Sequence, residues 1–215
     1  PIAGKQVMKV NLKAAVCVTM ALSLGLANTA IAFEPGDWLI RAGVTNVDPK
    51  SNNHDVVSVD DATSMSINFT YMMTDIWGLE VLAAYPFEHD ITLDDGTKVG
   101  STKHLPPTVS IQYHFRPTEK FQPYFGVGLN YTSFFSEKTT GPLEGTNLKL
   151  DASWGLGGQL GFDVLMNDNW FLNLDLRYIN IESDATLDGT ALGTVKIDPW
   201  IYGAHIGYRF SALFN

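Results

Sequence analysis

Residues Ser64–Phe87 read SMSINFTYMMTDIWGLEVLAAYPF, with apolar and polar side chains alternating on both sides of a short turn. The apolar face carries Met65, Ile67, Phe69 and Tyr71 before the turn and Trp77, Leu79, Val81, Ala83, Tyr85 and Phe87 after it. A period of two is typical of β-strands, because successive side chains point to opposite faces of a sheet. The segment therefore predicts a β-hairpin with a wide apolar face. It suits either half of a soluble sandwich or one hairpin of a membrane barrel.

The same alternation recurs along the chain and predicts about eight strands in all. Besides the hairpin, the expected strands are Trp38–Thr45, Pro107–Phe115, Tyr124–Phe135, Leu148–Val164, Trp170–Ile181 and Trp200–Phe210. The connections alternate in length. Those at 74–76, 116–120 and 167–169 are short, and those at 48–63, 88–103, 136–147 and 182–193 are long and polar. Alternating short and long connections are typical of outer-membrane barrels, with tight periplasmic turns and longer outer loops.

The two faces of these strands distinguish a barrel from a sandwich. One face is almost uniformly apolar, with aromatic residues near the strand ends. The other is rich in glycine and carries Arg41, Glu80, His114, Lys149, Asp151, Asp163, Asp175, Arg177, His205 and Arg209. In lipid every backbone polar group must be paired, so such a sheet has to close. The prediction is an all-β protein: an eight-stranded antiparallel transmembrane β-barrel with short periplasmic turns and long extracellular loops.

The composition and the N-terminal segment indicate export. The 215 residues fit one domain, and a formal charge of −9 argues against nucleic acid as a partner. A basic stretch at 8–13, an apolar run at 14–26 and Ala30-Ile31-Ala32 form the pattern of a cleaved signal peptide. We therefore expect residues 1–32 to be upstream sequence and signal peptide, and residues 33–215 to be the outer-membrane barrel.

Several stretches, taken together, resemble one known family. FTYMMTDIWGLEVLAAYPF (69–87), HLPPT (104–108), QPYFGVGLNYTSFF (122–135), SWGLGGQLG (153–161) and DPW (198–200) resemble the outer-membrane protein W family in order along the chain. The resemblance implies an outer-membrane barrel of a Gram-negative bacterium. It also implies passage of small hydrophobic molecules through a narrow, laterally opening lumen. The inward Leu that helps close this lumen in known members aligns with Leu82, whereas the closing Trp aligns with Arg177.

The charged inner face predicts a plug in the lower lumen. An eight-stranded barrel is just wide enough to be filled by its own side chains or to hold one small ligand. We expect ion pairs among Arg41, Glu80, His114, Asp163, Asp175 and Arg209. Buried charges must be paired wherever they occur, so these residues are equally explained by a purely structural role.

Prolines mark the predicted outer ends of the strands. Pro86 and Pro107 each lie about ten residues from a short turn, a climb of roughly 25 Å that matches the apolar band of a barrel. Proline cannot donate to a strand ladder, so Pro86 and the facing Pro106-Pro107 predict missing backbone bonds there. The hypothesis is a lateral opening, fed by an apolar upper lumen of Leu82, Leu105, Phe134 and Ile179. The alternative is a simple bend of the strands.

The same sequence bears on other functions and partners. His54, His89 and His104 lie near acidic pairs in sequence, but no Gly-x-Ser-x-Gly or metal-ligand spacing accompanies them, so no enzyme, metal site or cofactor is predicted. A structural or adhesive barrel without transport stays an alternative. The expected partners are outer-membrane lipid and lipopolysaccharide and small hydrophobic solutes. The aromatic face of Tyr202–Phe210 further resembles the signal read by the barrel-assembly machinery.

Overall fold

The computed structural model of the protein describes residues 33–50, 57–93, 95–115 and 120–211. The expected signal peptide (residues 1–32), His54, Asp94 and residues 116–119 and 212–215 lie outside this described part, so cleavage after Ala32 stays a prediction. Within the described ranges, no helix is long and apolar enough to cross a membrane.

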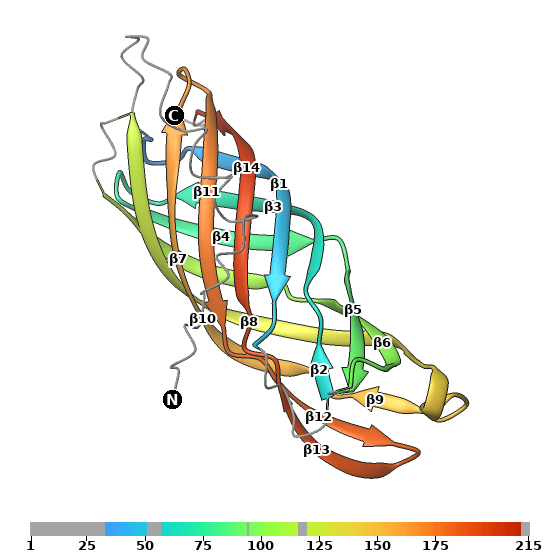
Figure 1. The fold of residues 1–215 in the computed structure, drawn as a ribbon. Coiled ribbons are helices and arrows are strands. Elements are labelled where there is room, and N and C mark those ends of the chain that lie inside the picture. Colours follow the sequence, from blue (N-terminus) through green and yellow to red (C-terminus); the bar gives the residue numbers. More distant parts are fainter. Residues whose placement is uncertain (1–32, 51–56, 94, 116–119, 212–215) are drawn as a thin grey trace, which may run out of the picture.

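Eight strands form a closed barrel in which neighbouring strands run antiparallel. In order around the barrel they are β1 (Trp38–Asp48), β3 (Ala62–Met72), β4 (Trp77–Ala84), β7 (Thr108–His114), β8 (Phe121–Thr139), β10 (Ser153–Leu165), β11 (Trp170–Ile179) and β14 (Trp200–Phe210). Strand β14 pairs with β1 from Trp38↔Phe210 to Asp48↔Trp200, and β10 pairs with β8, so the ring of eight barrel strands has no free edge. The predicted eight-stranded antiparallel barrel is confirmed (Figure 1).

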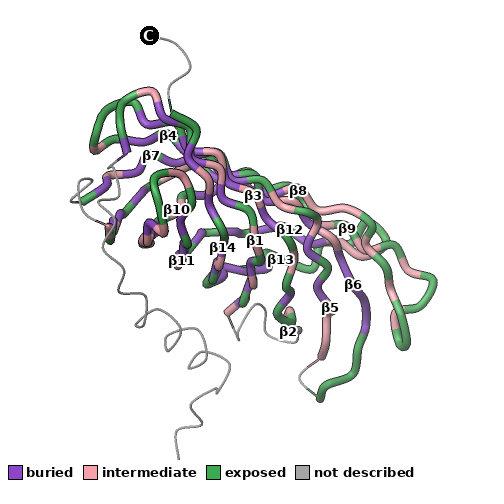
Figure 2. The backbone as a smooth tube through the Cα atoms, turned by 90° about the horizontal axis from the view of Figure 1, so that it is seen from above, coloured by how far each residue is buried: buried purple, intermediate pink, exposed green. Residues whose placement is uncertain are grey.

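The barrel wall has an apolar outer face and a polar inner face. Along β4, Val81 is 42% exposed, whereas its neighbours Glu80 and Leu82 are 0% and 5% exposed. Figure 2 shows the alternation of buried and exposed residues along the barrel strands. Each strand therefore presents alternate side chains to lipid and to the lumen, as in membrane barrels.

Aromatic pairs lie at both ends of the apolar wall. At the turn end, the ring centroids of Trp38 and Tyr71 are 5.1 Å apart, and those of Trp170 and Tyr208 are 4.8 Å apart. At the outer end, Tyr131 and Trp154 lie 4.8 Å apart. Aromatic girdles of this kind sit at the two interfaces of a membrane.

The long connections, expected as polar extracellular loops, carry strands of their own. Strands β2 (Val57–Val59), β5 (Phe87–Leu93) and β6 (Lys98–Leu105) extend the sheet beside the outer half of β8. Strands β9 (Leu148–Leu150), β12 (Glu182–Leu187) and β13 (Thr190–Lys196) form a separate three-stranded sheet, and a short 3-10 helix, η2, covers Gly141–Leu143. Both groups project beyond the same end of the barrel (Figure 1). They form because their apolar residues meet in one buried cluster that includes Phe87, Ala185 and Val195.

The segment expected as one strand, Leu148–Val164, is two strands. It is interrupted at Asp151 and Ala152, where β9 ends and β10 begins. The backbone N–H of Asp151 donates to the carbonyl of Asp184 at 3.1 Å, so the chain is held by the outer sheet at this break. The alternation of side chains alone did not reveal the change of partner strand.

Candidate functional site

The lower lumen is crossed by buried ion pairs, the first of which is centred on Arg41 of β1. Its guanidinium donates twice to the carboxylate of Asp163, with Nη2–Oδ2 and Nε–Oδ1 distances of 2.7 and 3.0 Å. Nη1 donates to the hydroxyl of Thr70 at 2.7 Å and lies 3.8 Å from Glu80. All the charged side chains in this group are fully buried, and the paired geometry compensates for their lost hydration.

A second group of ion pairs is centred on Arg177 of β11. Nη1 of Arg177 lies 2.8 Å from Glu80, and Nε lies 2.7 Å from Asp175. Asp175 also lies 3.3 Å from the ring of His205, and Gln112 donates to the second oxygen of Glu80 at 2.8 Å. Glu80 thus joins the two arginines. We call Arg41, Glu80, Asp163, Asp175 and Arg177 the ion-pair layer.

Below the ion-pair layer lies an apolar layer at the turn end of the barrel. It consists of Phe33, Leu39, Met72, Leu165 and Phe171. The expectation that His114 takes part in the ion pairs is corrected. Its ring packs against the rings of Tyr124 and Phe33, with centroid distances of 5.2 and 6.0 Å, and its Nε2 is hydrogen-bonded to Gln112. Arg209 lies lower still, 3.7 Å from Asp37.

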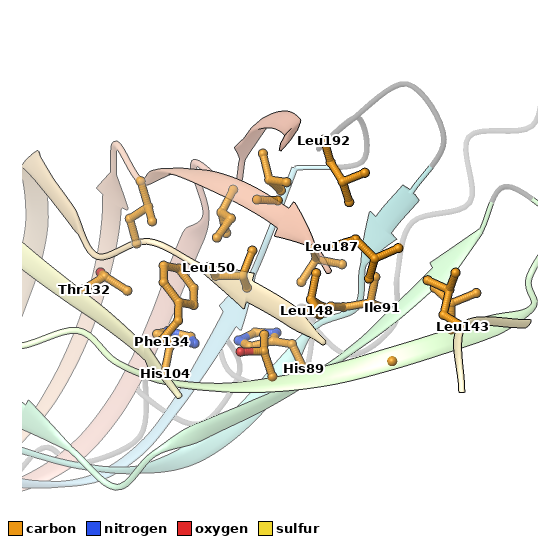
Figure 3. A pocket seen from close by; sticks show the side chains of 18 of the residues that line it. His89, Ile91, His104, Thr132, Phe134, Leu143, Leu148, Leu150, Leu187 and Leu192 are labelled. Atoms are coloured by element: carbon orange, nitrogen blue, oxygen red, sulfur yellow. The ribbon is translucent and has the colours of Figure 1, made fainter. Parts of the chain in front are cut away.

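Above the barrel, the two groups of outer strands line a partly open cavity of about 150 Å³. We call it the outer cavity. Its lining is mostly apolar and includes Ile91, Val99, Phe134, Leu150, Leu187 and Val195. The polar residues of the lining are His89, Thr102, His104 and Thr132. Figure 3 shows the rings of His89, His104 and Phe134 side by side, with leucine side chains above them in this view.

The two histidines are neutral members of an aromatic stack. The rings of His89 and His104 lie 4.9 Å apart at an angle of 22°, and Phe87 stacks on His104 at 5.3 Å. Burial lowers the pKa of His104 to about 3, with nearby His89 as the second cause. Burial also lowers the pKa of His89, although the carbonyl of Asp60 and nearby carboxylates act in the opposite direction. The outer cavity is therefore uncharged near neutral pH.

The strand ladder is interrupted between the lower lumen and the outer cavity. Strands β4 and β7 are paired up to Leu82↔Thr108, and pairing resumes at Phe87↔His104 between β5 and β6. Between these points no register pair joins 83–86 to 105–107 in the described chain. The N–H of Tyr85 donates to the carbonyl of Met65 on β3, and the carbonyl of Pro107 accepts from the N–H of Tyr131 on β8. We call this interruption the seam.

Comparison with known proteins identifies the barrel. A family model described as the OmpW family matches residues 34–210, which contain all the strands above. The chain belongs to the OmpW family. Outer membrane protein W of Vibrio cholerae is 39% identical over 93% of this chain and 100% of that protein. The corresponding protein of Escherichia coli K12 is 37% identical over 89% of this chain and 96% of that protein.

The chain is also similar to a solved structure and to a more distant relative. The crystal structure of OprG from Pseudomonas aeruginosa has a TM-score of 0.73 at 33% identity, covering 86% of this chain and 99% of that one. A dibenzothiophene metabolism operon protein, PahQ, of the same species is 25% identical over 82% of this chain and 90% of that protein. As an OmpW-family barrel, the protein lies in the outer membrane.

The residues expected in an apolar upper lumen of this OmpW-family barrel are only partly together. Phe134 lines the outer cavity, and Ile179 lies in the apolar cluster that packs beside it. Leu82 is buried at the lower edge of the seam. The expectation that Leu105 lines an apolar lumen is corrected. Leu105 is half-buried and is not part of the cavity lining, because its neighbour His104 faces the cavity and successive side chains of a strand point to opposite faces.

Other expectations concerned Arg177 and the prolines. Arg177, which aligns with the closing Trp of the family, lies in the ion-pair layer, where Glu80 and Asp175 hold it. Pro86, Pro106 and Pro107 flank the seam. In the part of the chain that the structure describes, no group of three or more His, Cys, Asp or Glu side chains is placed to hold a metal ion.

Sequence reasoning missed the cavity wall itself. His89 and His104 were considered as possible catalytic residues, and Leu187 lies in the connection expected as a polar loop at 182–193. The alternation of Phe87, His89 and Ile91 is a signal that could have identified β5, and the HLPPT stretch contains His104.

Proposed function

We propose that the protein takes up small hydrophobic molecules at the outer face of the outer membrane, holds them in the outer cavity and releases them sideways through the seam. The outer cavity carries this proposal. At about 150 Å³ with a mostly apolar lining, it offers space that is unfavourable for water. An engineered apolar cavity of roughly the same volume stays dry and binds benzene.

The ion-pair layer argues against passage straight down the barrel. An apolar molecule on that route would have to separate Glu80 from Arg177 and Arg41 from Asp163, which are buried and in contact. Removing one partner of a buried ion pair is strongly unfavourable, typically by about 3–5 kcal/mol. The same layer also blocks water and ions, so a molecule in the outer cavity needs another exit.

The seam supplies a sideways route. The three prolines at the seam lack the N–H group that a strand ladder needs. The backbone groups of Tyr85 and Pro107 form hydrogen bonds to β3 and β8, on the far sides of the seam, and not to each other's strand. Parting the strands here costs fewer hydrogen bonds than parting them elsewhere in the barrel. The seam opens onto the apolar wall, where a hydrophobic molecule is well solvated by lipid.

The name of a relative supports the class of molecule. PahQ is named for the metabolism of dibenzothiophene, an apolar aromatic compound. We extend from that name only the chemical class, small and hydrophobic, because the outer cavity of this chain is lined by the side chains that such a molecule prefers.

Uptake by liposomes tests the proposal. The Leu82→Trp variant places a bulky ring on the inner side of the wall at the lower edge of the seam. We expect it to slow uptake of a small apolar fluorescent probe several-fold. The matched control is Val81→Trp, whose side chain faces lipid one residue earlier and should leave uptake unchanged.

The heat-dependent shift in gel mobility of a folded barrel serves as the folding control for both variants. Equal uptake by the wild type and folded Leu82→Trp would contradict release at the seam. Absence of uptake by a folded wild-type barrel would instead favour a structural or adhesive role.

A further inference from the structure

The lining of the outer cavity includes a buried acceptor that the fold leaves without a partner. His89 is 2% exposed and lines the cavity, and its Nε2 has no hydrogen-bond partner among the described residues. Buried polar atoms are nearly always hydrogen-bonded, so an unpaired one next to a cavity calls for an explanation. The apolar side chains of the lining cannot supply the missing bond.

The other ring nitrogen fixes the chemistry of Nε2. Nδ1 of His89 lies 2.6 Å from the backbone carbonyl of Asp60. A carbonyl oxygen only accepts, so Nδ1 carries the proton. In a neutral imidazole the second nitrogen is then an acceptor. Asp60, Asp61, Asp90 and His104 are the titratable groups around the ring, and burial outweighs the carboxylates in lowering the pKa of His89.

We infer that the outer cavity prefers a small, otherwise apolar molecule with one hydroxyl group, which donates its hydrogen bond to Nε2 of His89. This inference rests on the proposed function and specifies its ligand. The threonines of the lining direct their hydroxyl hydrogens elsewhere, Thr132 to Asn130 at 2.7 Å and Thr102 to the carbonyl of Lys103 at 3.4 Å, so neither donates to Nε2 of His89. The bond to Nε2 is therefore left for the ligand.

The stacked rings further define the shape of the ligand. His89, His104 and Phe134 form a continuous aromatic wall, with centroid distances of 4.9 Å and 5.9 Å along it (Figure 3). A flat ring packs well on such a wall. With space for about one ring, a phenol fits the cavity better than a long-chain alcohol.

The test compares three ligands of nearly the same shape on the folded protein in lipid nanodiscs. These are 4-methylphenol, toluene, which lacks the hydroxyl, and 4-methylanisole, whose oxygen has no hydrogen to donate. Binding is measured against nanodiscs without protein, to subtract partition into lipid. We expect the wild type to bind 4-methylphenol about tenfold more tightly than either analogue, the effect of one buried hydrogen bond.

Two variants assign the effect to His89. His89→Phe keeps a ring but removes the acceptor and should abolish the preference, whereas His104→Phe is the matched control and should retain it. If His89→Phe fails to fold, the ¹⁵N resonance of His89 Nε2 in the wild type gives the same answer. The chain has five histidines, so this signal can be assigned, and it should shift with 4-methylphenol and not with toluene.

The outcomes distinguish the hydroxyl preference from the proposed function on which it rests. Equal binding of all three ligands would overturn the hydroxyl preference and leave the proposed function standing. Loss of the preference in His104→Phe but not in His89→Phe would overturn the role of His89. Binding of none of the three ligands would overturn both the preference and the proposed function.

Discussion

Glu80 is the single residue on which the lower lumen most depends. It lies between Arg41 and Arg177, 3.8 Å from the first and 2.8 Å from the second, and it also accepts from Gln112. Without its charge, the carboxylates of Asp163 and Asp175 remain, but Nη1 of Arg177 loses its only nearby anionic oxygen among the described ion pairs. A buried guanidinium cannot release its proton to escape this cost.

We therefore predict that Glu80→Gln destabilises the barrel by about 3–5 kcal/mol, measured by urea unfolding in lipid and followed by gel mobility. The matched control is Glu88→Gln on β5, since Glu88 is paired with Lys103 at 3.4 Å and is 52% exposed. An exposed pair contributes less than about 1 kcal/mol. Similar losses in the two variants would contradict the importance of the ion-pair layer.

At the level of single residues, the sequence predicted the inward side chains of the barrel strands but not their partners, and it wrongly placed Lys149 and Asp151 on the inner face, since both are exposed in or beside β9. Strand alternation placed Glu80, Asp163 and Arg177 on one face correctly. It could not give the height of Arg177 in the lumen relative to Leu82, because that depends on the stagger of strands far apart in the chain. The partnership of His89 with Asp60 is equally non-local.

Among the elements, the outer strands were the hardest to predict from the sequence. The barrel strands alternate strictly, whereas the outer pairs contain register shifts, between Ile91 and Thr92 in β5–β6 and between Ala185 and Thr186 in β12–β13. Each shift moves the following side chains to the opposite face and so breaks the period of two. These segments therefore looked like loops, although their apolar residues build the outer cavity.

The β5–β6 hairpin should weaken in acid because it buries His89 and His104. In the unfolded hairpin His104 returns from its folded pKa of about 3 toward its ordinary value of 6.5, so the unfolded form binds more protons between these values. Stability is thus complete above pH 6.5 and falls as the pH drops toward 3. Methyl NMR signals of Ile91 and Val99 should report loosening in acid. His104→Phe should reduce the effect, and signals of the wild type that do not change with pH would contradict it.

On the scale of the whole molecule, two regions with opposite chemistry are stacked along one axis. The lower lumen is filled by ion pairs and an apolar layer at the turn end, and the outer strands line an uncharged apolar cavity. The seam lies between them, on the wall that faces lipid. On the proposed route, a hydrophobic molecule leaves the barrel above the ion-pair layer, so its uptake does not open a path for ions.

The most direct test of this route is to locate a bound molecule by intermolecular NOEs. The protein is deuterated, methyl-labelled at Ala, Ile, Leu, Thr and Val, and placed in nanodiscs with toluene. We predict NOEs from toluene to Leu150 and Val195 in the outer cavity and to Ala84 at the seam. We predict none to Thr70, which is hydrogen-bonded to Arg41 of the ion-pair layer. NOEs to Thr70, or only to lipid-facing methyls such as those of Val127, would contradict the account.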